Sequence, residues 1–214
     1  TEYVVRLDPP LDEEYKIRLN DDLGKVYRKL KKYEESLSHL ETALTMRETS
    51  DDSVLVQNRT ITLNRMGYTY ALMKRYDDAK QAFEEVISIV TQEYDGDPAS
   101  ELAWGKSGLA YVYFLQDDYE KAEEMYNAAL AVIKDTRGKH HPFAISVMQG
   151  LARVERKRGD LKESLRHAQK AYDLIMFQKG EGHAELYRQQ QFIDTLQREQ
   201  RLSQEKKPEN INES

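Results

Sequence analysis

One sequence unit recurs four times along this chain at a nearly constant interval. Each copy is marked by a small residue, directly preceded by Leu or Met. The small residues follow one another after 43, 43 and 42 positions: Gly24, Gly67, Ala110 and Ala152. A fixed interval of this length is typical of an array of like units, each of which buries its apolar face against its neighbours.

Large residues stand at fixed distances from the small ones, as two packed helices require. Helices approach closely where one presents Gly, Ala or Ser, and the facing helix then fills the space with a large side chain. One such column is formed by Tyr27, Tyr70, Tyr113 and Glu155, and another by Leu40, Phe83, Tyr126 and Ala168. The fourth copy departs in both columns, which predicts a loosely filled unit that an outside helix could complete.

Capping residues predict where several helices begin. Asp118 can cap the second helix of the third copy, and Asp160 with Glu163 fits a capping box in the fourth. Lys32 and Arg75 hold the same position in the first two copies, so those turns should lack a side-chain cap. At the start of the chain, Asp8-Pro9-Pro10 is a helix-start signal, which predicts a first helix over residues 11–31.

The helix-turn-helix pattern resembles the tetratricopeptide repeat, whose ordinary period is about 34 residues. The surplus length falls in links such as Gly96-Asp97-Pro98 and Gly138-Lys139-His140-His141-Pro142, which resemble those of the long-period variant in kinesin light chains. The resemblance implies an all-α, right-handed solenoid. We expect a leader over residues 1–10, a single domain over 11–202 and a disordered tail over 203–214. The domain is expected to contain four repeats, at about 17–53, 60–96, 103–138 and 145–180, and a capping helix at 184–202.

The helical register predicts which side chains line a groove. We number each repeat so that its small residue is position 8; positions 2, 5, 9, 12 and 13 then lie about 140° from the packing positions 4, 7, 8 and 11. In the tetratricopeptide family the first set faces the concave groove. This set of positions is mainly apolar in the two central repeats and mainly basic in the two end repeats, where Asp21 is its only acidic residue. The predicted peptide-binding groove consists of Asn64, Tyr68, Leu72, Trp104, Tyr111, Phe114 and Leu115, and its basic ends consist of Arg18, Lys25, Arg28, Lys29, Arg153, Arg156 and Lys157.

These residues predict a non-enzymatic scaffold or adaptor that binds an acidic peptide with a bulky apolar anchor. The resemblance points the same way, since kinesin light chains recognise cargo peptides with a Trp among acidic residues. That family favours an Asn pair before the core Leu, and here only Asn64 fits. The Lys and Asn clamp of the chaperone-binding relatives is absent, because Asp21 and Lys25 stand at its two positions in the first repeat.

Other classes of function are less well supported by the sequence. We expect no catalytic residues, cofactor or metal site: there is no Cys, no phosphate-binding loop, and the five His suggest no ligand set, with His141 read as a helix cap. A net charge of −6 argues against nucleic acid, and no apolar run could cross a membrane, so a cytoplasmic protein is expected. The alternatives left open are an assembly module that docks a partner helix or associates with itself, a regulatory domain of a larger protein, and an RNA-binding solenoid.

Overall fold

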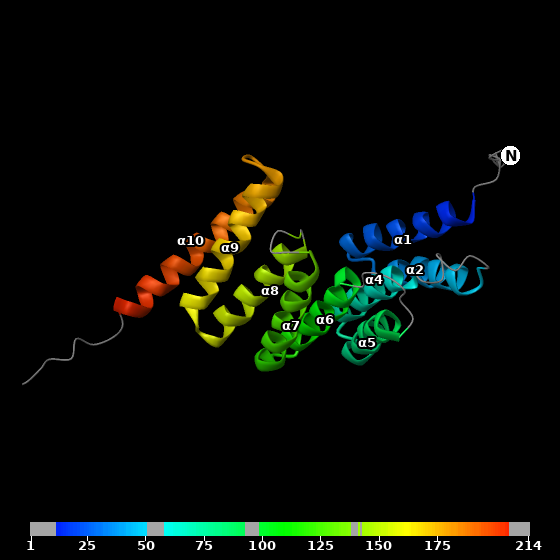
Figure 1. Ribbon diagram of the computed structural model, residues 1–214, viewed down its shortest axis with the longest axis horizontal. Helices are drawn as coiled ribbons and strands as arrows, with labels where there is room; N and C mark the ends of the chain where they lie inside the picture. The colour runs from blue at the N-terminus through cyan, green and yellow to red at the C-terminus, as the bar shows by residue number, and fades with distance from the viewer. Residues whose placement is uncertain (1–11, 51–57, 93–98, 138–140, 142, 206–214) are drawn as a thin grey trace, which may run out of the picture. The chain divides into compact units, whose positions relative to one another are not determined.

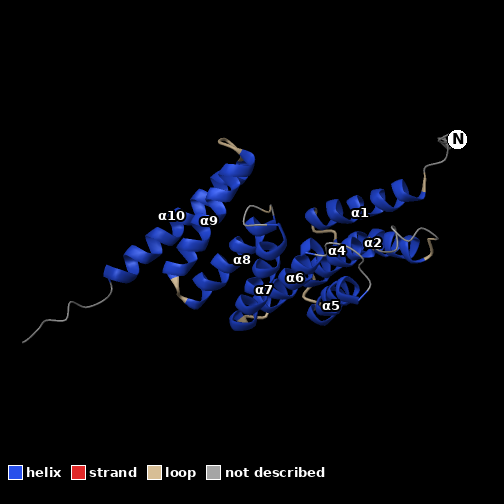
Figure 2. Cartoon of the chain, in the orientation of Figure 1, coloured by secondary structure: helices blue, strands red, loops and turns tan. Residues whose placement is uncertain are grey.

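The computed structural model describes residues 12–50, 58–92, 99–137, 141 and 143–205, and all regular structure in them is α-helical (Figures 1 and 2). This confirms the all-α class. The chain divides into two compact units, residues 1–112 and 113–214, with the boundary inside one helix. The helices are α1 (Glu13–Lys29), α2 (Tyr33–Glu48), α4 (Arg59–Leu72), α5 (Tyr76–Gln92), α6 (Ala99–Leu115), α7 (Tyr119–Arg137), α8 (Phe143–Arg158), α9 (Leu161–Lys179) and α10 (Ala184–Glu205).

The helices pack in sequence order within each unit. In the first unit α1 packs on α2, α2 on α4 and α4 on α5; in the second, α7 packs on α8, α8 on α9 and α9 on α10. The cores are small clusters between neighbouring helices, such as Leu63 with Val86 and Ile89 in the first unit and Ile145 with Ile175 and Leu186 in the second. Each helix pair therefore depends on its neighbours for burial, as in a repeat solenoid.

The small-against-large packing predicted from the columns is present. A Cβ placed on Gly24 would lie 2.6 Å from Leu40 Cγ, and one on Gly67 would lie 2.7 Å from Phe83 Cζ. Phe83 is fully buried, so the ring cannot move aside for an added methyl group. The glycines in these positions therefore set how closely the first helix of each pair approaches the second.

The turn inside each pair has one geometry in all four copies. In the second copy, Arg75 N–H donates to the Tyr70 carbonyl at 2.9 Å and Lys74 N–H donates to the Ala71 carbonyl at 3.1 Å, the bonds of a Schellman motif. The motif requires a left-handed residue, and Lys74 has φ 62°. The equivalent residues Lys31, Asp117 and Gly159 also have positive φ. Only the fourth copy uses glycine, the residue that adopts this conformation without strain.

Replacing Lys74 with glycine should therefore stabilise the protein. We expect Lys74→Gly to raise the free energy of unfolding by about 1 kcal/mol, since a left-handed conformation costs a non-glycine residue about that much. Lys74 is exposed, so little packing is lost. Chemical denaturation followed by circular dichroism measures the change, and Gly159→Lys is the reverse control. Destabilisation by Lys74→Gly would contradict this account of the turn.

The predicted caps at Asp118 and Asp160 are present, although Glu163 does not return the second bond of a capping box. Asp118 Oδ1 accepts from Lys121 N–H at 3.2 Å, and Asp160 Oδ1 accepts from Glu163 N–H at 3.1 Å. Lys32, at the N-cap of α2, makes no side-chain cap. His141 Nδ1 accepts from the Phe143 N–H at 3.2 Å, in keeping with its expected role at the start of α8.

Two helix ends differ from the expected ones. The first helix begins at Glu13, because Asp12 caps it by accepting from Tyr15 N–H at 2.6 Å; the Asp8-Pro9-Pro10 signal lies outside the described residues. The last helix continues to Glu205, three residues beyond the expected Leu202. Residues 203–205 are thus helical, and the rest of the expected disordered tail lies outside the described residues.

The expectation of a loosely filled fourth repeat is wrong. Ala168 is fully buried in a cluster with Ala152, Ile193 and Leu196, so that α10 of the same chain fills the space left by the small side chain. Glu155 is buried against His167, as described below. No outside helix is required at this position.

Candidate peptide-binding surface

A groove in the second unit brings together four of the residues predicted to line the binding surface. It has a volume of about 630 Å³ and is lined by Phe114 from the end of α6, by Arg153, Arg156 and Lys157 from α8, and by Phe192 and Glu199 from α10. Two aromatic rings therefore lie among three cations and a single carboxylate. An apolar side chain and acidic groups of one ligand could be bound here together.

Glu199 neutralises one of the three cations. The Arg156 guanidinium donates through Nε to Glu199 Oε2 at 3.0 Å and through Nη2 to Oε1. These bonds raise the pKa of Arg156 and lower that of Glu199. The same guanidinium lies 5.7 Å from the centre of the Phe192 ring, a cation–π distance. Arg156 is thus held by α10.

The other two cations have no acidic partner. Arg153 and Lys157 are exposed, and no carboxylate among the described residues forms an ion pair with either. They lie four residues apart on α8 and therefore on the same helix face. Their positive charge remains available to a ligand.

A second hollow of about 270 Å³ adjoins the groove, since the two share Arg153 and Phe192. Its other lining residues are Gln149, Glu185, Arg188 and Gln189. Gln149 donates to Gln189 at 3.1 Å, and Gln189 in turn donates to the Ala168 carbonyl at 2.9 Å. These bonds fix α10 against α8 and α9, so the wall that carries Phe192 is held in place.

The first unit contains an aromatic cluster at the predicted groove positions. Tyr68 lies 5.8 Å from Tyr111 and edge-on to Phe83 at 5.1 Å, between ring centres, and the Arg28 guanidinium lies 5.7 Å from the Tyr68 ring centre. Burial raises the pKa of Tyr68, although a hydrogen bond with Ser107 and the charge of Arg28 act in the opposite direction. Burial lowers the pKa of Arg28.

Two polar atoms of this cluster are buried without a hydrogen-bond partner among the described residues, Arg28 Nε and Asn64 Oδ1. One is a donor and the other an acceptor. An unpaired buried polar atom costs about 1–3 kcal/mol, which a ligand able to pair with it would recover.

The remaining predicted groove residues are at least partly exposed. Leu72 is 38% exposed, and Trp104 and Leu115 are half-buried. At the predicted basic end on α1, Lys25 and Lys29 are exposed, and Arg18 forms an exposed ion pair with Glu14 at 3.6 Å. Such an exposed pair contributes little to stability, so Arg18 can exchange partners.

Asp21 lines a hollow of about 360 Å³ with Arg18 and Ile61, but its carboxylate is held by the protein rather than presented to a ligand. Its side chain is only 4% exposed and pairs with the equally buried Arg47 of α2 at 2.7 Å. Thr62 of α4 bridges the pair: its hydroxyl donates to Asp21 at 2.9 Å and accepts from Arg47 Nε at 3.1 Å. Arg65 approaches Asp21 to 3.5 Å. Asp21 therefore ties three helices together.

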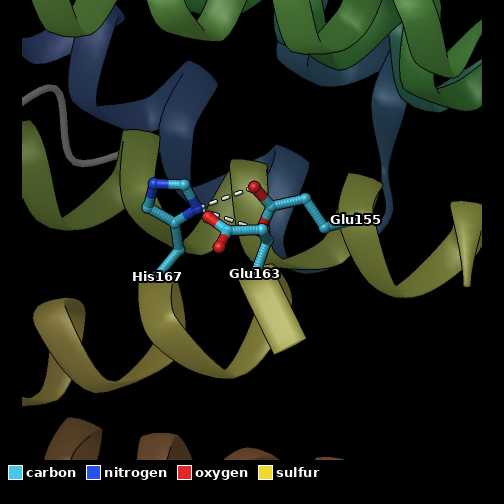
Figure 3. A group of neighbouring side chains, drawn as sticks. All are labelled: Glu155, Glu163 and His167. Carbon is cyan, nitrogen blue, oxygen red and sulfur yellow. Dashed lines mark hydrogen bonds and ion pairs between the residues drawn. The ribbon is translucent and has the colours of Figure 1, made fainter. Parts of the chain in front are cut away.

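A His and two Glu of the second unit form the only group among the described residues with metal-ligand geometry (Figure 3). Glu155 reaches from α8 toward Glu163 and His167, which are neighbours on α9. His167 Nε2 lies 3.0 Å from Arg166 Nη2. Because a guanidinium only donates, Nε2 accepts, the ring proton is on Nδ1, and His167 donates to both oxygens of Glu155 at 2.8 and 2.9 Å.

Arg166 also donates to Glu163 at 2.6 Å, so a protein cation already lies where a metal would bind. The cluster joins α8 to α9, and its side chains line a hollow of about 480 Å³. His167 lies between α8 and α9. A sequence signal for the pair of Glu155 and His167 exists. Glu155 replaces the tyrosine of its column, and a His follows twelve residues later.

The groove also takes Phe192 and Glu199 from α10, whereas the sequence predicted only a capping helix over residues 184–202. A usable signal was present, since Glu199 follows Arg156 by 43 residues and Arg65 follows Asp22 by 43, one repeat period in each case. Opposite charges one period apart can pair across neighbouring repeats.

The fold and the groove define a class of protein: stacked antiparallel helix pairs that present a surface to a partner. Three models of the tetratricopeptide repeat match the chain, at residues 21–50, 62–89 and 101–175. The chain belongs to the tetratricopeptide-repeat family. This fold is typically a non-enzymatic protein-interaction scaffold.

Solved structures of this fold are similar to the chain at low sequence identity. A putative kinesin light chain of Podospora anserina with nearly identical repeats has a TM-score of 0.63 at 17% identity, over 89% of each chain. BtubC (BKLC) from P. vanneervenii has a TM-score of 0.62 at 16% identity, over 88% of this chain and 84% of its own. The apo form of RapI has a TM-score of 0.60 at 19% identity, over 79% of this chain, which spans only 59% of RapI. No curated protein sequence matches the chain. None of the described helices is long and apolar enough to span a bilayer.

Proposed function

We propose that this protein is an adaptor that binds a peptide segment with a bulky apolar anchor and acidic flanks. The observation that carries the proposal is the groove of the second unit, in which Phe114 and Phe192 lie beside Arg153 and Lys157. The apolar and cationic groups of one groove match the two parts of such a peptide.

The anchor would bind between the two phenylalanines. A volume of about 630 Å³ admits a large side chain, and both rings are only partly buried in the free protein. Binding energy concentrates where aromatic side chains are desolvated in a pocket, so the anchor should contribute most of the affinity. The charged rim should contribute less.

The acidic flanks would pair with Arg153 and Lys157. Charges at the rim of an interface act mainly on the rate of association and on specificity, and salt screens them. Binding should therefore weaken as ionic strength rises. Glu199 limits the contribution of Arg156, because a ligand carboxylate would have to displace it.

The aromatic cluster of the first unit supports a second set of contacts. Tyr68, Trp104 and Tyr111 are partly exposed and offer ring surface to a ligand. The cytoplasmic location expected from the sequence remains a prediction.

Fluorescence anisotropy with a labelled peptide tests this proposal. The probe is a short peptide with one Trp flanked by Asp and Glu, and the controls replace Trp by Ser or the acids by Asn and Gln. We expect the wild-type protein to bind the probe. Phe192→Ala should bind it about tenfold more weakly, because a desolvated aromatic contact is lost. Tyr187→Ala, which removes an exposed ring of the same helix, should bind the probe as the wild type does. Equal affinity for all three peptides would overturn the proposal.

A further inference from the structure

The first helix presents an apolar stripe that nothing in the described part of the chain covers. Tyr15, Leu19, Val26 and Leu30 are 52%, 43%, 49% and 62% exposed. Their spacing places all four within about 60° of one another around the helix axis, since successive residues differ by about 100°. The stripe lies about 100° from the groove positions of α1, so it is a separate face.

Two of these four register positions, those of Leu19 and Val26, are buried in every later repeat. Leu19 stands at position 3 and Val26 at position 10. The equivalent residues are Thr62, Gly105, Val147 and Gln189 at position 3, and Thr69, Val112, Val154 and Leu196 at position 10; all are buried. Among the described residues only the first repeat exposes these two positions, although Leu19 and Val26 are aliphatic like the buried Val147 and Val154 of the fourth repeat.

A preceding second helix covers these positions in the later repeats. Thr62 of α4 accepts from Arg47 of α2, a Cβ on Gly105 of α6 would lie 2.7 Å from Ile87 of α5, and Gln189 of α10 donates to the Ala168 carbonyl of α9. A face of this shape therefore packs on another helix.

The four residues of the stripe are spaced symmetrically along α1. Four residues separate Tyr15 from Leu19, and four separate Val26 from Leu30, so an antiparallel copy of α1 places Tyr15 opposite Leu30 and Leu19 opposite Val26. A two-fold axis near Asp22 and Leu23 generates both contacts twice, as in an isologous dimer. Asp22 lies close to this axis, and its charge is compensated by Arg65 at 3.4 Å.

The charges of α1 favour the antiparallel direction. Its first turn carries Glu13 and Glu14 after the capping Asp12, and its last turn carries Arg28 and Lys29. An antiparallel pair brings the acidic end of each copy to the basic end of the other, and the helix dipoles then oppose one another. A parallel pair would bring like charges together at both ends.

We propose that this face is a homodimer interface, in which the apolar stripes of two α1 helices pack antiparallel about a two-fold axis. A single helix pair buries less area than a standard protein interface, so the dimer should be weak, with a Kd on the order of 10 µM. None of the four stripe residues lines the groove of the second unit, so the two proposals can be tested separately.

Sedimentation equilibrium of the whole chain over a range of concentrations is the first test. We expect a monomer–dimer equilibrium, and Leu19→Glu should raise the dimer Kd about tenfold or more, because two charges would enter an apolar contact. Tyr187→Glu, which adds the same charge at an exposed ring of α10, is the matched control and should leave the equilibrium unchanged. A wild-type chain that stays monomeric at 100 µM would overturn the proposal, as would a dimer that Leu19→Glu leaves intact.

Mixing two charge variants tests whether the charged ends of α1 meet those of a second α1. Glu13→Lys with Glu14→Lys makes both ends of α1 basic, and Lys25→Glu with Lys29→Glu makes the last two turns acidic. Each variant alone should be mainly monomeric, whereas an equimolar mixture should form heterodimers, since basic ends then meet acidic ones. Circular dichroism verifies that each variant is folded. A mixture that associates no better than its components would exclude pairing between the ends of two α1 helices.

Discussion

Arg153→Glu should weaken binding of the acidic Trp peptide about thirtyfold, which corresponds to about 2 kcal/mol. Arg153 lines both the groove and the adjoining hollow and lacks an acidic partner in the described residues, so its charge is available to a ligand. The substitution removes one attraction and adds a repulsion, and it leaves the core unchanged because Arg153 is exposed. Titration by fluorescence anisotropy at low salt measures the effect.

Lys162→Glu is the matched control, since it makes the same charge change at an exposed position of α9 outside the groove. A peptide with Lys flanks should bind Arg153→Glu better than the wild type, because a change of sign in one partner is compensated by a change in the other. If Lys162→Glu and Arg153→Glu weaken binding equally, the effect belongs to net charge and the groove assignment is contradicted.

Arg47→Met should lower the free energy of unfolding by about 3–5 kcal/mol. The substitution leaves the buried Asp21 carboxylate without its closest cation, and removing one partner of a buried ion pair has an effect of this size. The Thr62 hydroxyl and Arg65, at 3.5 Å, would compensate only in part. Urea denaturation followed by circular dichroism measures the change.

The double variant Asp21→Leu with Arg47→Met separates the unpaired charge from lost packing. It should be more stable than Arg47→Met alone, because no charge then remains buried. If the losses in unfolding free energy of Asp21→Leu and Arg47→Met simply add in the double variant, the two side chains do not interact as their 2.7 Å contact indicates.

The repeated columns predicted the helix pairs and their turns because they depend on local chemistry. Small residues, large residues and capping Asp recur at one interval, and the contact of Gly67 with Phe83 and the cap at Asp160 follow directly from it. The helix register also assigned Arg153, Lys157 and Phe114 to one face, and these residues line one groove in the structure; their role in binding stays a prediction. A helix period is enough to assign side chains to faces when the fold repeats.

Pairs between helices could not be predicted in the same way. The register placed Asp21 in the groove, whereas its short side chain turns toward Arg47, 26 positions later. Glu155 stands in a column of tyrosines, so the sequence predicts unfilled space beside it. In the structure the side chain of His167 contacts Glu155 there. Such contacts depend on side-chain rotamers and on which helices are neighbours, and neither has a periodic signal.

The most direct test of the central claim is to map the peptide on the protein by NMR. In a titration of the ¹⁵N-labelled chain with the acidic Trp peptide, we expect the largest amide shift changes around Phe114, Arg153, Lys157 and Phe192, with smaller ones around Tyr68 and Trp104. Shift changes confined to the opposite faces of α7 and α9, or none at saturating peptide, would contradict the assignment of this groove as the binding surface.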